Sequence, residues 1–347
     1  MTKSRSRAWR YLGRRLAITA VVLVGITFVS FATVYVLPGD PITARYPQLG
    51  EEERRIAREQ MGLSSSLPVQ YVTYMRSLVQ GDLGFSYNTG SPVAHDLQAR
   101  LGPTFELVVY SLMFAILVAV PLGIVAGARK NRWVDHVSRL LAIATLSIPV
   151  FWSGLVAIFV FFYLLDWAPA PVGRLPLSVS PPPQRTGFLT VDSVLAGEWS
   201  TCAAAWQALA LPVAVLGLSL IAPIARITRS AVAEALQEKH VLFARAIGVG
   251  EREVILRDAF RGAQVALLTV VGYTVGYLIA GTALVEEVFS WPGMGRYSVQ
   301  AVVTSDQAAI QAVLLVVAVG IAITNLCVDI GYAIVDPRIR HGFLGRS

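Results

Sequence analysis

Residues 231–263 read AVAEALQEKHVLFARAIGVGEREVILRDAFRGA, and this charged stretch lies between two long apolar runs. Its apolar residues, Leu236 and Val241 among them, have helical spacing. Gly248 then interrupts the pattern, and a second amphipathic piece begins at Val254. Glycine fits where a helix ends in a left-handed residue. The stretch therefore predicts a short helix, a break and another helix, which together form a compact knob.

The composition excludes an ordinary soluble globule. Hydrophobic residues make up 55% of the 347 residues and charged residues 15%, and the mean hydropathy is +0.60. A net charge of +7 and a pI near 9.6 would also fit nucleic-acid binding, but the basic residues lie in blocks beside apolar runs. Such blocks are typical of topology signals that face anionic lipid. We therefore expect an integral membrane protein in a lipid bilayer, without a nucleic-acid partner.

Six apolar runs predict six transmembrane helices within residues 16–335. They are Leu16–Leu37, Thr104–Ala128, Val137–Leu165, Trp206–Ile227, Gln264–Leu284 and Ile310–Val335. The first run is longer than the apolar region of a signal peptide, and no A-x-A-like cleavage site follows it, so we expect it to be retained. Basic residues in the N-terminal segment 1–15, after the second and fourth runs and in the tail 336–347 predict that both termini are cytoplasmic.

Three segments are expected outside the membrane on the far side from the termini. Residues 38–103 are polar, with acids and bases nearly balanced, and residues 285–308 form an outer hairpin. Residues 166–205 are rich in proline, so we expect them to build neither helix nor sheet and to lie extended on the outer face.

Turn-forming residues mark the outer hairpin. Pro292, Gly293 and Gly295 enforce a tight turn, while Phe289 and Trp291 are predicted to anchor it at the membrane boundary. An interfacial aromatic belt would explain Trp291 but not the clustered turn residues.

The third apolar run is interrupted by SIPVFW, residues 147–152. Proline inside a span frees a carbonyl that lipid cannot satisfy, so this face is expected to be buried or to line a cavity. A translocation-path kink at Pro149 and Trp152 and an ordinary packed kink explain the motif equally well.

The sequence lacks motifs for chemistry of its own. It contains no G-x-x-x-x-G-K-[ST] phosphate cradle, no H-E-x-x-H and no G-x-S-x-G. Its four histidines show no ligand spacing, and Cys202 and Cys327 are far apart. We therefore expect no catalytic residue, no metal site and no cofactor bound by this chain.

Several motifs resemble one transporter family. Ala244-Arg245-Ala246-Ile247-Gly248 resembles the EAA loop of bacterial ABC-importer permeases. LPGDP at 37–41, Gln70-Tyr71, GDLGFS at 81–86 and VEEVFSWPGMGR at 285–296 occur in the order found in the B-type permeases of peptide and nickel importers. The resemblance covers nearly the whole chain and is poorest in residues 166–205. The chain has Gly262 and Ala266 where many relatives carry Asn and then Pro.

This resemblance implies an all-α membrane protein with the type I ABC-importer permease fold and a cytoplasmic coupling helix. It implies a multi-pass subunit of the bacterial inner membrane that imports short peptides. The implied partners are a C-type permease subunit in a heterodimer, two ATPase subunits that use ATP and Mg, and an extracytoplasmic substrate-binding protein. In this family the coupling loop docks on an ATPase subunit, and the outer hairpin lies near the substrate gate.

The resemblance also assigns candidate site residues. The coupling surface would consist of Ala244, Arg245, Ala246, Gly248, Val254 and Leu256. The gate would include Glu286, Phe289, Trp291, Pro292, Gly293 and Gly295. Two alternatives stay open: the same kind of importer carrying nickel or another small solute, and a membrane receptor or scaffold that transports nothing and needs no ATPase.

Overall fold

The computed structural model describes residues 2–36, 48–60, 65–128 and 148–335. These residues are mostly helical and fall into two compact units, which are described separately below. The LPGDP motif, the first part of the third predicted span and the tail 336–347 lie outside the described residues.

Five of the described helices are long and apolar enough to cross a membrane. They contain Gly13–Ala32, Val93–Ala128, Trp199–Ala235, Glu251–Ile279 and Gln307–Tyr332. A shorter apolar helix, Val150–Leu164, lies within the third predicted span. The prediction of a helical membrane protein is thereby confirmed at the level of five candidate spans.

The first unit holds the N-terminal helices and the second half of the outer hairpin. Its elements are α1 (Thr2–Val36), α3 (Glu51–Gln60), α4 (Leu67–Val79), β1 (Phe85–Ser86), β2 (Ser91–Pro92), the first turns of α5 (Val93–Ala128), α14 (Met294–Val303) and most of α15 (Gln307–Val335). β1 and β2 pair antiparallel. Polar side chains join α1 to its neighbours: the Thr27 and Tyr71 hydroxyls are 2.9 Å apart, and Ser30 donates to the Gln311 carbonyl at 3.0 Å.

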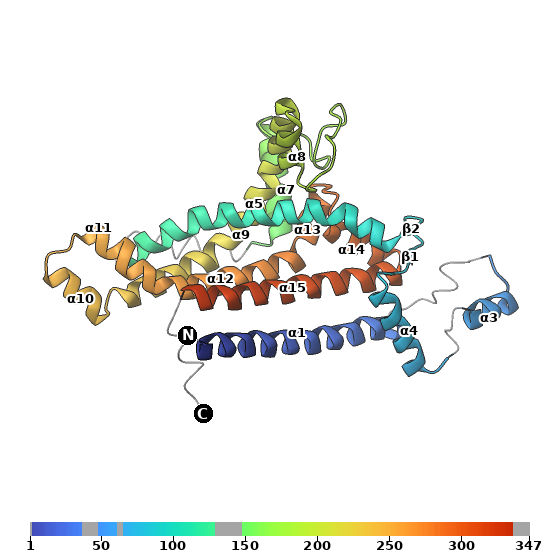
Figure 1. The fold of residues 1–347 in the computed structure, drawn as a ribbon. Coiled ribbons are helices and arrows are strands. Elements are labelled where there is room, and N and C mark those ends of the chain that lie inside the picture. Colours follow the sequence, from blue (N-terminus) through green and yellow to red (C-terminus); the bar gives the residue numbers. More distant parts are fainter. Residues whose placement is uncertain (1, 37–47, 61–64, 129–147, 336–347) are drawn as a thin grey trace. The chain divides into compact units, whose positions relative to one another are not determined.

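The second unit holds the rest of α5 and the central spans. Its elements are α7 (Val150–Ala157), the π-helix η1 (Ile158–Leu164), α8 (Leu189–Ala196), α9 (Trp199–Ala235), α10 (Lys239–Ala246), α11 (Glu251–Glu253), the π-helix η2 (Val254–Ala259), α12 (Phe260–Gly281), α13 (Ala283–Val288) and the end of α15. α9 and α12 lie side by side (Figure 1). With 37 residues, α9 is about 55 Å long, whereas the hydrocarbon core of a bilayer is about 30 Å thick. α9 therefore extends beyond the hydrocarbon core.

Glycines let α5 and α9 approach closely in the second unit. A Cβ atom at Gly123 would lie 2.6 Å from Thr228 Cβ, and one at Gly127 would lie 2.8 Å from the Arg229 carbonyl oxygen. Real Cβ atoms do not tolerate such contacts, so both positions require glycine at this spacing. Lipid offers no hydrophobic drive for helix association, and close packing through small residues takes its place.

The proline-rich outer loop is more structured than its composition predicts. α8 occupies Leu189–Ala196 and ends at Gly197, whose φ of +73° is the left-handed conformation typical of a helix end. The prolines stop at Pro183, and the sequence LTVDSVLA that follows has none. The expectation of a loop without helix is therefore wrong for residues 189–196 and also for residues 199–205, which begin α9, because the prolines occupy only the first part of the segment.

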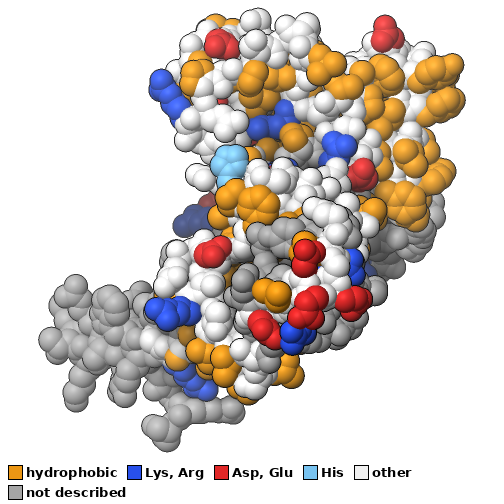
Figure 2. All heavy atoms as spheres, turned by 90° about the vertical axis from the view of Figure 1, so that its right-hand side faces the viewer, with side chains coloured by type: hydrophobic (Ala, Val, Ile, Leu, Met, Phe, Trp, Pro, Cys, Tyr) orange, Lys and Arg blue, Asp and Glu red, His pale blue; other side chains and the backbone are white. Residues whose placement is uncertain are grey.

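Apolar side chains cover much of the outside of the molecule. Val21, Leu117 and Tyr273 each expose 70% or more of their surface. Figure 2 shows such side chains spread over broad areas of one face. Apolar areas of this extent are typical of surfaces that lipid or another protein covers.

Candidate functional site

The elbow, residues 236–259, connects α9 to α12 and lies at the opposite end of α9 from α8 (Figure 1). α10 ends before Gly248, which has a φ of +87°. The Gly248 N–H donates to the Arg245 carbonyl at 3.0 Å, and the Val249 N–H donates to the Ala244 carbonyl at 3.1 Å. These two bonds form a Schellman motif, in which a left-handed residue closes a helix. The predicted helix, break and second helix are confirmed.

A small buried core fixes the elbow to the two long helices. Val241 of α10 and Val254 and Ala259 of η2 are completely buried. They pack in one cluster with Val232, Ala235 and Leu236 from the end of α9 and Ala263 from the start of α12. Because both long helices contribute to this cluster, the elbow packs as one piece with the end of α9 and the start of α12.

An ion pair clamps the two halves of the elbow together across Gly248. Arg245 at the end of α10 donates from Nε to Glu251 Oε2 at 3.0 Å and from Nη2 to Glu251 Oε1 at 2.6 Å. This bidentate geometry fixes the orientation of the two side chains as well as the distance between them. Both side chains are partly exposed, so the pair orients the elbow while adding little to global stability.

The solvent-exposed surface of the elbow carries apolar residues. The exposed fraction is 51% for Leu242, 66% for Phe243, 64% for Ile247 and 49% for Leu256. They lie among charged residues; Leu242, Phe243 and Ile247 are outside the candidate membrane spans, and Leu256 lies near the start of one, Glu251–Ile279. Exposed apolar side chains with a charged rim are typical of a protein contact surface.

The predicted coupling residues divide between this surface and the elbow interior. Arg245, Ala246, Gly248 and Leu256 are exposed and Ala244 is half-buried. Val254 is completely buried in the elbow core, where it supports the surface without belonging to it. Sequence reasoning did not select Phe243 and Ile247, although large apolar residues beside a helix-ending glycine were a visible signal.

The first half of the outer hairpin is part of the core of the second unit. Glu286, Phe289 and Trp291 each expose 3% or less of their surface. Phe289 and Trp291 pack in the same cluster as core residues of α5 and α9. The prediction that they anchor the hairpin at the membrane boundary is corrected, because the turn directs both rings into the protein. Ser290 in that turn has a φ of +52°, and Trp291 N–H donates to the Glu286 carbonyl at 2.7 Å.

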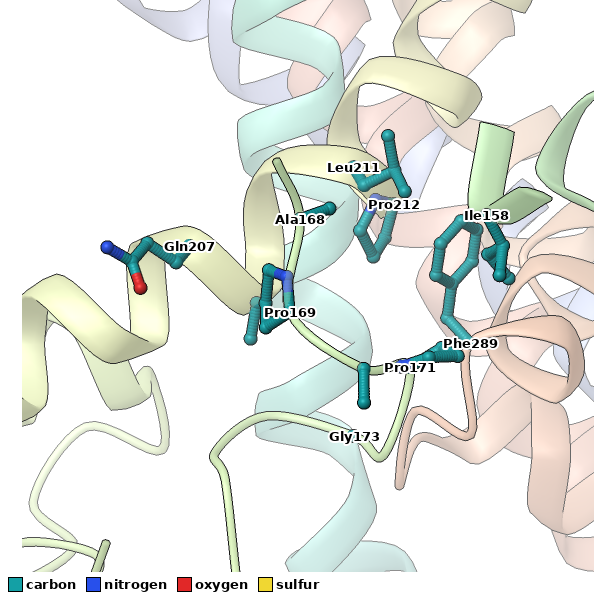
Figure 3. A pocket seen from close by; sticks show the side chains of 11 residues that line it. Ile158, Ala168, Pro169, Pro171, Gly173, Gln207, Leu211, Pro212 and Phe289 are labelled. Atoms are coloured by element: carbon teal, nitrogen blue, oxygen red, sulfur yellow. The ribbon is translucent and has the colours of Figure 1, made fainter. Parts of the chain in front are cut away.

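Phe289 also borders a small hollow beside α9. Figure 3 shows the residues that line it, with Phe289 close to Ile158 of η1 and Pro212 of α9. The first residues of the proline-rich loop complete the lining. Pro212 has no N–H to donate to the carbonyl of Ala208, and both residues line the hollow. The hollow therefore lies where an interruption of α9 meets the hairpin.

Gly154 of α7 lets the hairpin approach from another side. A Cβ atom at this position would lie 3.3 Å from both Phe289 Cε2 and Val288 Cγ1. The nearby Pro149 lies at the N-cap of α7 with an extended ψ of 134°, and Trp152 is half exposed. α7 therefore starts directly after Pro149, where the missing N–H breaks no bond within that helix. The residues before 148 lie outside the described residues, so the kink within the third span stays a prediction.

The remaining predicted hairpin residues lie in the first unit. Gly293 is the N-cap of α14, and Gly293 and Gly295 are buried, while Pro292 is exposed. The predicted tight turn at these residues is corrected: Gly293 and Gly295 belong to the start of α14, and the turn lies just before them, at Phe289 and Ser290.

A buried polar network between α5 and the outer loop was missed from the sequence. Glu106 is 1% exposed, and its carboxylate accepts from Arg174 Nη2 at 2.5 Å, from Thr190 N at 2.9 Å and from Thr190 Oγ1 at 2.7 Å. The Tyr110 hydroxyl lies 2.9 Å from Thr190 Oγ1. These contacts fasten the start of α8 to α5. The signal in the sequence was an acidic residue, Glu106, just inside an apolar run.

Asp192 stabilises the turn that leads into α8. It accepts from Thr186 N and Thr186 Oγ1 at 2.8 Å and from Gly187 N at 3.2 Å. Burial alone would raise the pKa of Asp192, but these hydrogen bonds outweigh it and lower the pKa below its ordinary value. The carboxylate is therefore charged at neutral pH and holds residues 186–192 in place.

Comparisons with known proteins cover nearly the whole chain. Residues 119–341 match the family described as binding-protein-dependent transport system inner membrane component, and residues 8–108 match the N-terminal part of such membrane components. The dipeptide transport system permease protein DppB of Alkalihalophilus pseudofirmus is 36% identical over 332 residues, covering 95% of this chain and 99% of the relative.

Two further relatives show the same level of similarity. The di/tripeptide transport system permease protein DppB of Pseudomonas aeruginosa is 36% identical, covering 95% of this chain and 98% of its own. The probable D,D-dipeptide transport system permease protein DdpB of Escherichia coli strain K12 is 36% identical, covering 96% and 98%.

Proposed function

The chain belongs to the family of binding-protein-dependent transport system inner membrane components, and on this premise we propose that it is the B-type permease subunit of an ABC importer for short peptides. It is a multi-pass protein of the bacterial inner membrane. As a permease subunit it is not itself an enzyme.

The elbow carries this proposal. It presents Phe243, Ile247 and Leu256 on its exposed side and is fixed through its buried core to two long helices. A rigid knob of this kind transmits a change of position from a docked partner to the spans. We assign Ala244, Arg245, Ala246, Gly248 and Leu256 to the docking surface or its immediate support.

Partner subunits supply the energy. To shift a two-state transporter from 1:99 to 99:1, a partner must favour one state by about 5.5 kcal/mol. Two ATPase subunits that bind ATP and Mg, docked on the elbows of this chain and of a C-type permease, are the proposed source. A substrate-binding protein delivers peptide to the opposite face.

The proposed topology has six spans with both termini in the cytoplasm. The five candidate spans and the shorter helix Val150–Leu164 support it, together with the basic segments beside them. The outer hairpin, including Glu286, Phe289 and Trp291, would then lie on the outer side near the gate.

The relatives' names support peptides as cargo, since those proteins are described as dipeptide, di/tripeptide and D,D-dipeptide permeases. Competition in an uptake assay identifies the cargo: unlabelled dipeptides should compete with a labelled dipeptide, whereas nickel should not.

The elbow is tested by Ala246→Glu. Ala246 is exposed in this chain, so the substitution leaves the fold intact and places a charge only in the contact with a docked ATPase subunit. Peptide uptake and co-purification of the ATPase subunits should both fall at least tenfold, with normal membrane insertion. Gln237→Glu is the matched control, because it adds the same charge to an exposed position of the same segment. Unimpaired uptake by Ala246→Glu would contradict the proposal.

A further inference from the structure

The motif GDLGFS, residues 81–86, forms a fixed turn next to the start of α15. Gly84 has a φ of +86°, and its N–H donates to Asp82 Oδ1 at 2.9 Å. A Cβ atom at Gly84 would lie 3.2 Å from the Cβ of Ala308. The motif therefore needs glycine both for its backbone conformation and for close contact with α15.

Ser86 extends this contact with a buried hydrogen bond. Ser86 Oγ donates to Asp306 Oδ2 at 2.5 Å, and both residues are at least 96% buried. The other oxygen of Asp306 accepts from Ala309 N–H at 3.2 Å, which caps the first turn of α15. A single carboxylate thus joins the motif to the beginning of the last span.

One face of α5 holds α14 in the same way. Asp96, Arg100 and Thr104 are spaced four residues apart, so they lie in a row along the first three turns of α5. Thr104 Oγ1 accepts from the Met294 N–H at 2.8 Å. The Arg100 guanidinium lies 4.4 Å from the centre of the Tyr297 ring, and the Tyr297 hydroxyl donates to Asp96 Oδ2 at 3.3 Å.

Further hydrogen bonds hold Asp96 and Arg100 in position on α5. Arg100 Nη1 donates to Asp96 Oδ1 at 2.7 Å, and Thr89 Oγ1 donates to Asp96 Oδ2. Burial, followed by the charges of Asp96 and Asp306, raises the pKa of Tyr297 to about 12. Tyr297 therefore keeps its proton at any physiological pH and remains a donor to Asp96.

We propose that Asp96, Arg100 and Thr104 hold α14 on the outer end of α5 throughout the transport cycle, with Tyr297 as the positioning residue. This inference rests on the proposed function and adds to it which part of the outer hairpin is fixed. Separating α14 from α5 would take the acceptors away from the Met294 N–H and the Tyr297 hydroxyl, both in buried residues, and would remove the Tyr297 ring from Arg100. The second half of the hairpin consequently moves with the second span as one body, and substrate does not pass between α14 and α5.

A reversible cross-link tests whether the two helices separate. Thr104→Cys and Met294→Cys are combined in a chain whose Cys202 and Cys327 are replaced by alanine, and the pair is joined by a short thiol-specific linker. The whole transporter is used, in the nucleotide-free and in the ATP-bound state. We expect equal cross-linking in both states and peptide uptake within twofold of the same variant after reduction.

Two results would overturn the inference. One is a cross-link that forms in only one nucleotide state, and the other is a loss of uptake above tenfold that dithiothreitol restores. The comparison with the reduced form removes any effect of the substitutions themselves. If wild-type transporter failed to import peptide, the proposed function would fail, while the dependence of the cross-link on nucleotide would still decide the inference.

The positioning role of Tyr297 is tested separately with Tyr297→Phe, which keeps the ring over Arg100 and removes only the hydroxyl. We expect normal amounts in the membrane but at least threefold less peptide imported per ATP hydrolysed. In a chain that already carries Asp96→Asn, Tyr297→Phe should add little, because the carboxylate that accepts from the tyrosine hydroxyl is already gone. Tyr273→Phe, at an exposed tyrosine, is the control. An unchanged ratio of peptide to ATP in Tyr297→Phe would refute the role.

Discussion

Replacing Glu106 with alanine should release the outer loop. The Glu106 carboxylate is 1% exposed and accepts three hydrogen bonds, one of them from Arg174 Nη2 at 2.5 Å. Removing one partner of a buried ion pair costs about 3 to 5 kcal/mol, because the other charge stays buried without compensation. At 1.36 kcal/mol per factor of ten, this cost corresponds to an increase in the population of the locally open loop of between roughly 150-fold and several thousand-fold.

Limited trypsin digestion measures this opening. Arg174 and Arg185 are the bases between residues 166 and 205, and Arg185 is exposed. When opening is fast, the cleavage rate follows the population of the open form. Cleavage after Arg185 should therefore accelerate at least 100-fold in Glu106→Ala.

Two further variants separate the ion pair from other causes. Glu198→Ala removes an acid that accepts one hydrogen bond, from Thr201, and should change the rate little. Glu106→Met combined with Arg174→Met should be cleaved more slowly than Glu106→Ala, since no unpaired charge remains buried. A cleavage rate in Glu106→Ala within threefold of wild type would refute the reasoning. Such a result is expected if residues 166–205 form an extended loop that Glu106 does not hold in place.

Three other predictions concern separate parts of the chain. Gly127→Leu should prevent α5 from packing on α9, because even a Cβ atom would lie 2.8 Å from the Arg229 carbonyl, and should abolish accumulation of the folded protein in membranes. Glu251→Gln breaks the clamp with Arg245, so peptide imported per ATP should fall several-fold, while the unfolding free energy falls by at most about 1 kcal/mol. The lowered pKa of Asp192 stabilises the native state above about pH 4, and this contribution is lost as pH falls through the native pKa. The melting temperatures of wild type and Asp192→Asn should therefore differ at pH 7 and approach each other as the pH falls below about 4.

The elbow was predictable because its signals are local. Gly248, the helical spacing before it and the charged surroundings all lie within a few residues of one another, and the structure gives Gly248 the expected left-handed conformation. Which apolar residues face outward was not predictable, because Val254 is buried only through contact with the ends of α9 and α12.

The outer segments were less predictable because their order depends on distant partners. Thr190 meets Glu106 across 84 positions of the chain, and Ser86 meets Asp306 across 220. Composition records the prolines of the outer loop but not these pairings. Similarly, the aromatic residues of the hairpin suggest a membrane boundary, whereas the turn at Ser290 buries Phe289 and Trp291.

The shared core of the elbow limits how permeases can be recombined. Val241 and Val254 pack against Val232 and Ala263, which belong to the membrane-crossing helices and not to the connecting segment. A chimera that exchanges residues 236–259 alone between two relatives would therefore join surfaces that were never matched to each other. To redirect this subunit to a foreign motor, the exchanged piece has to include the ends of both helices, so recognition and bilayer packing are inherited together.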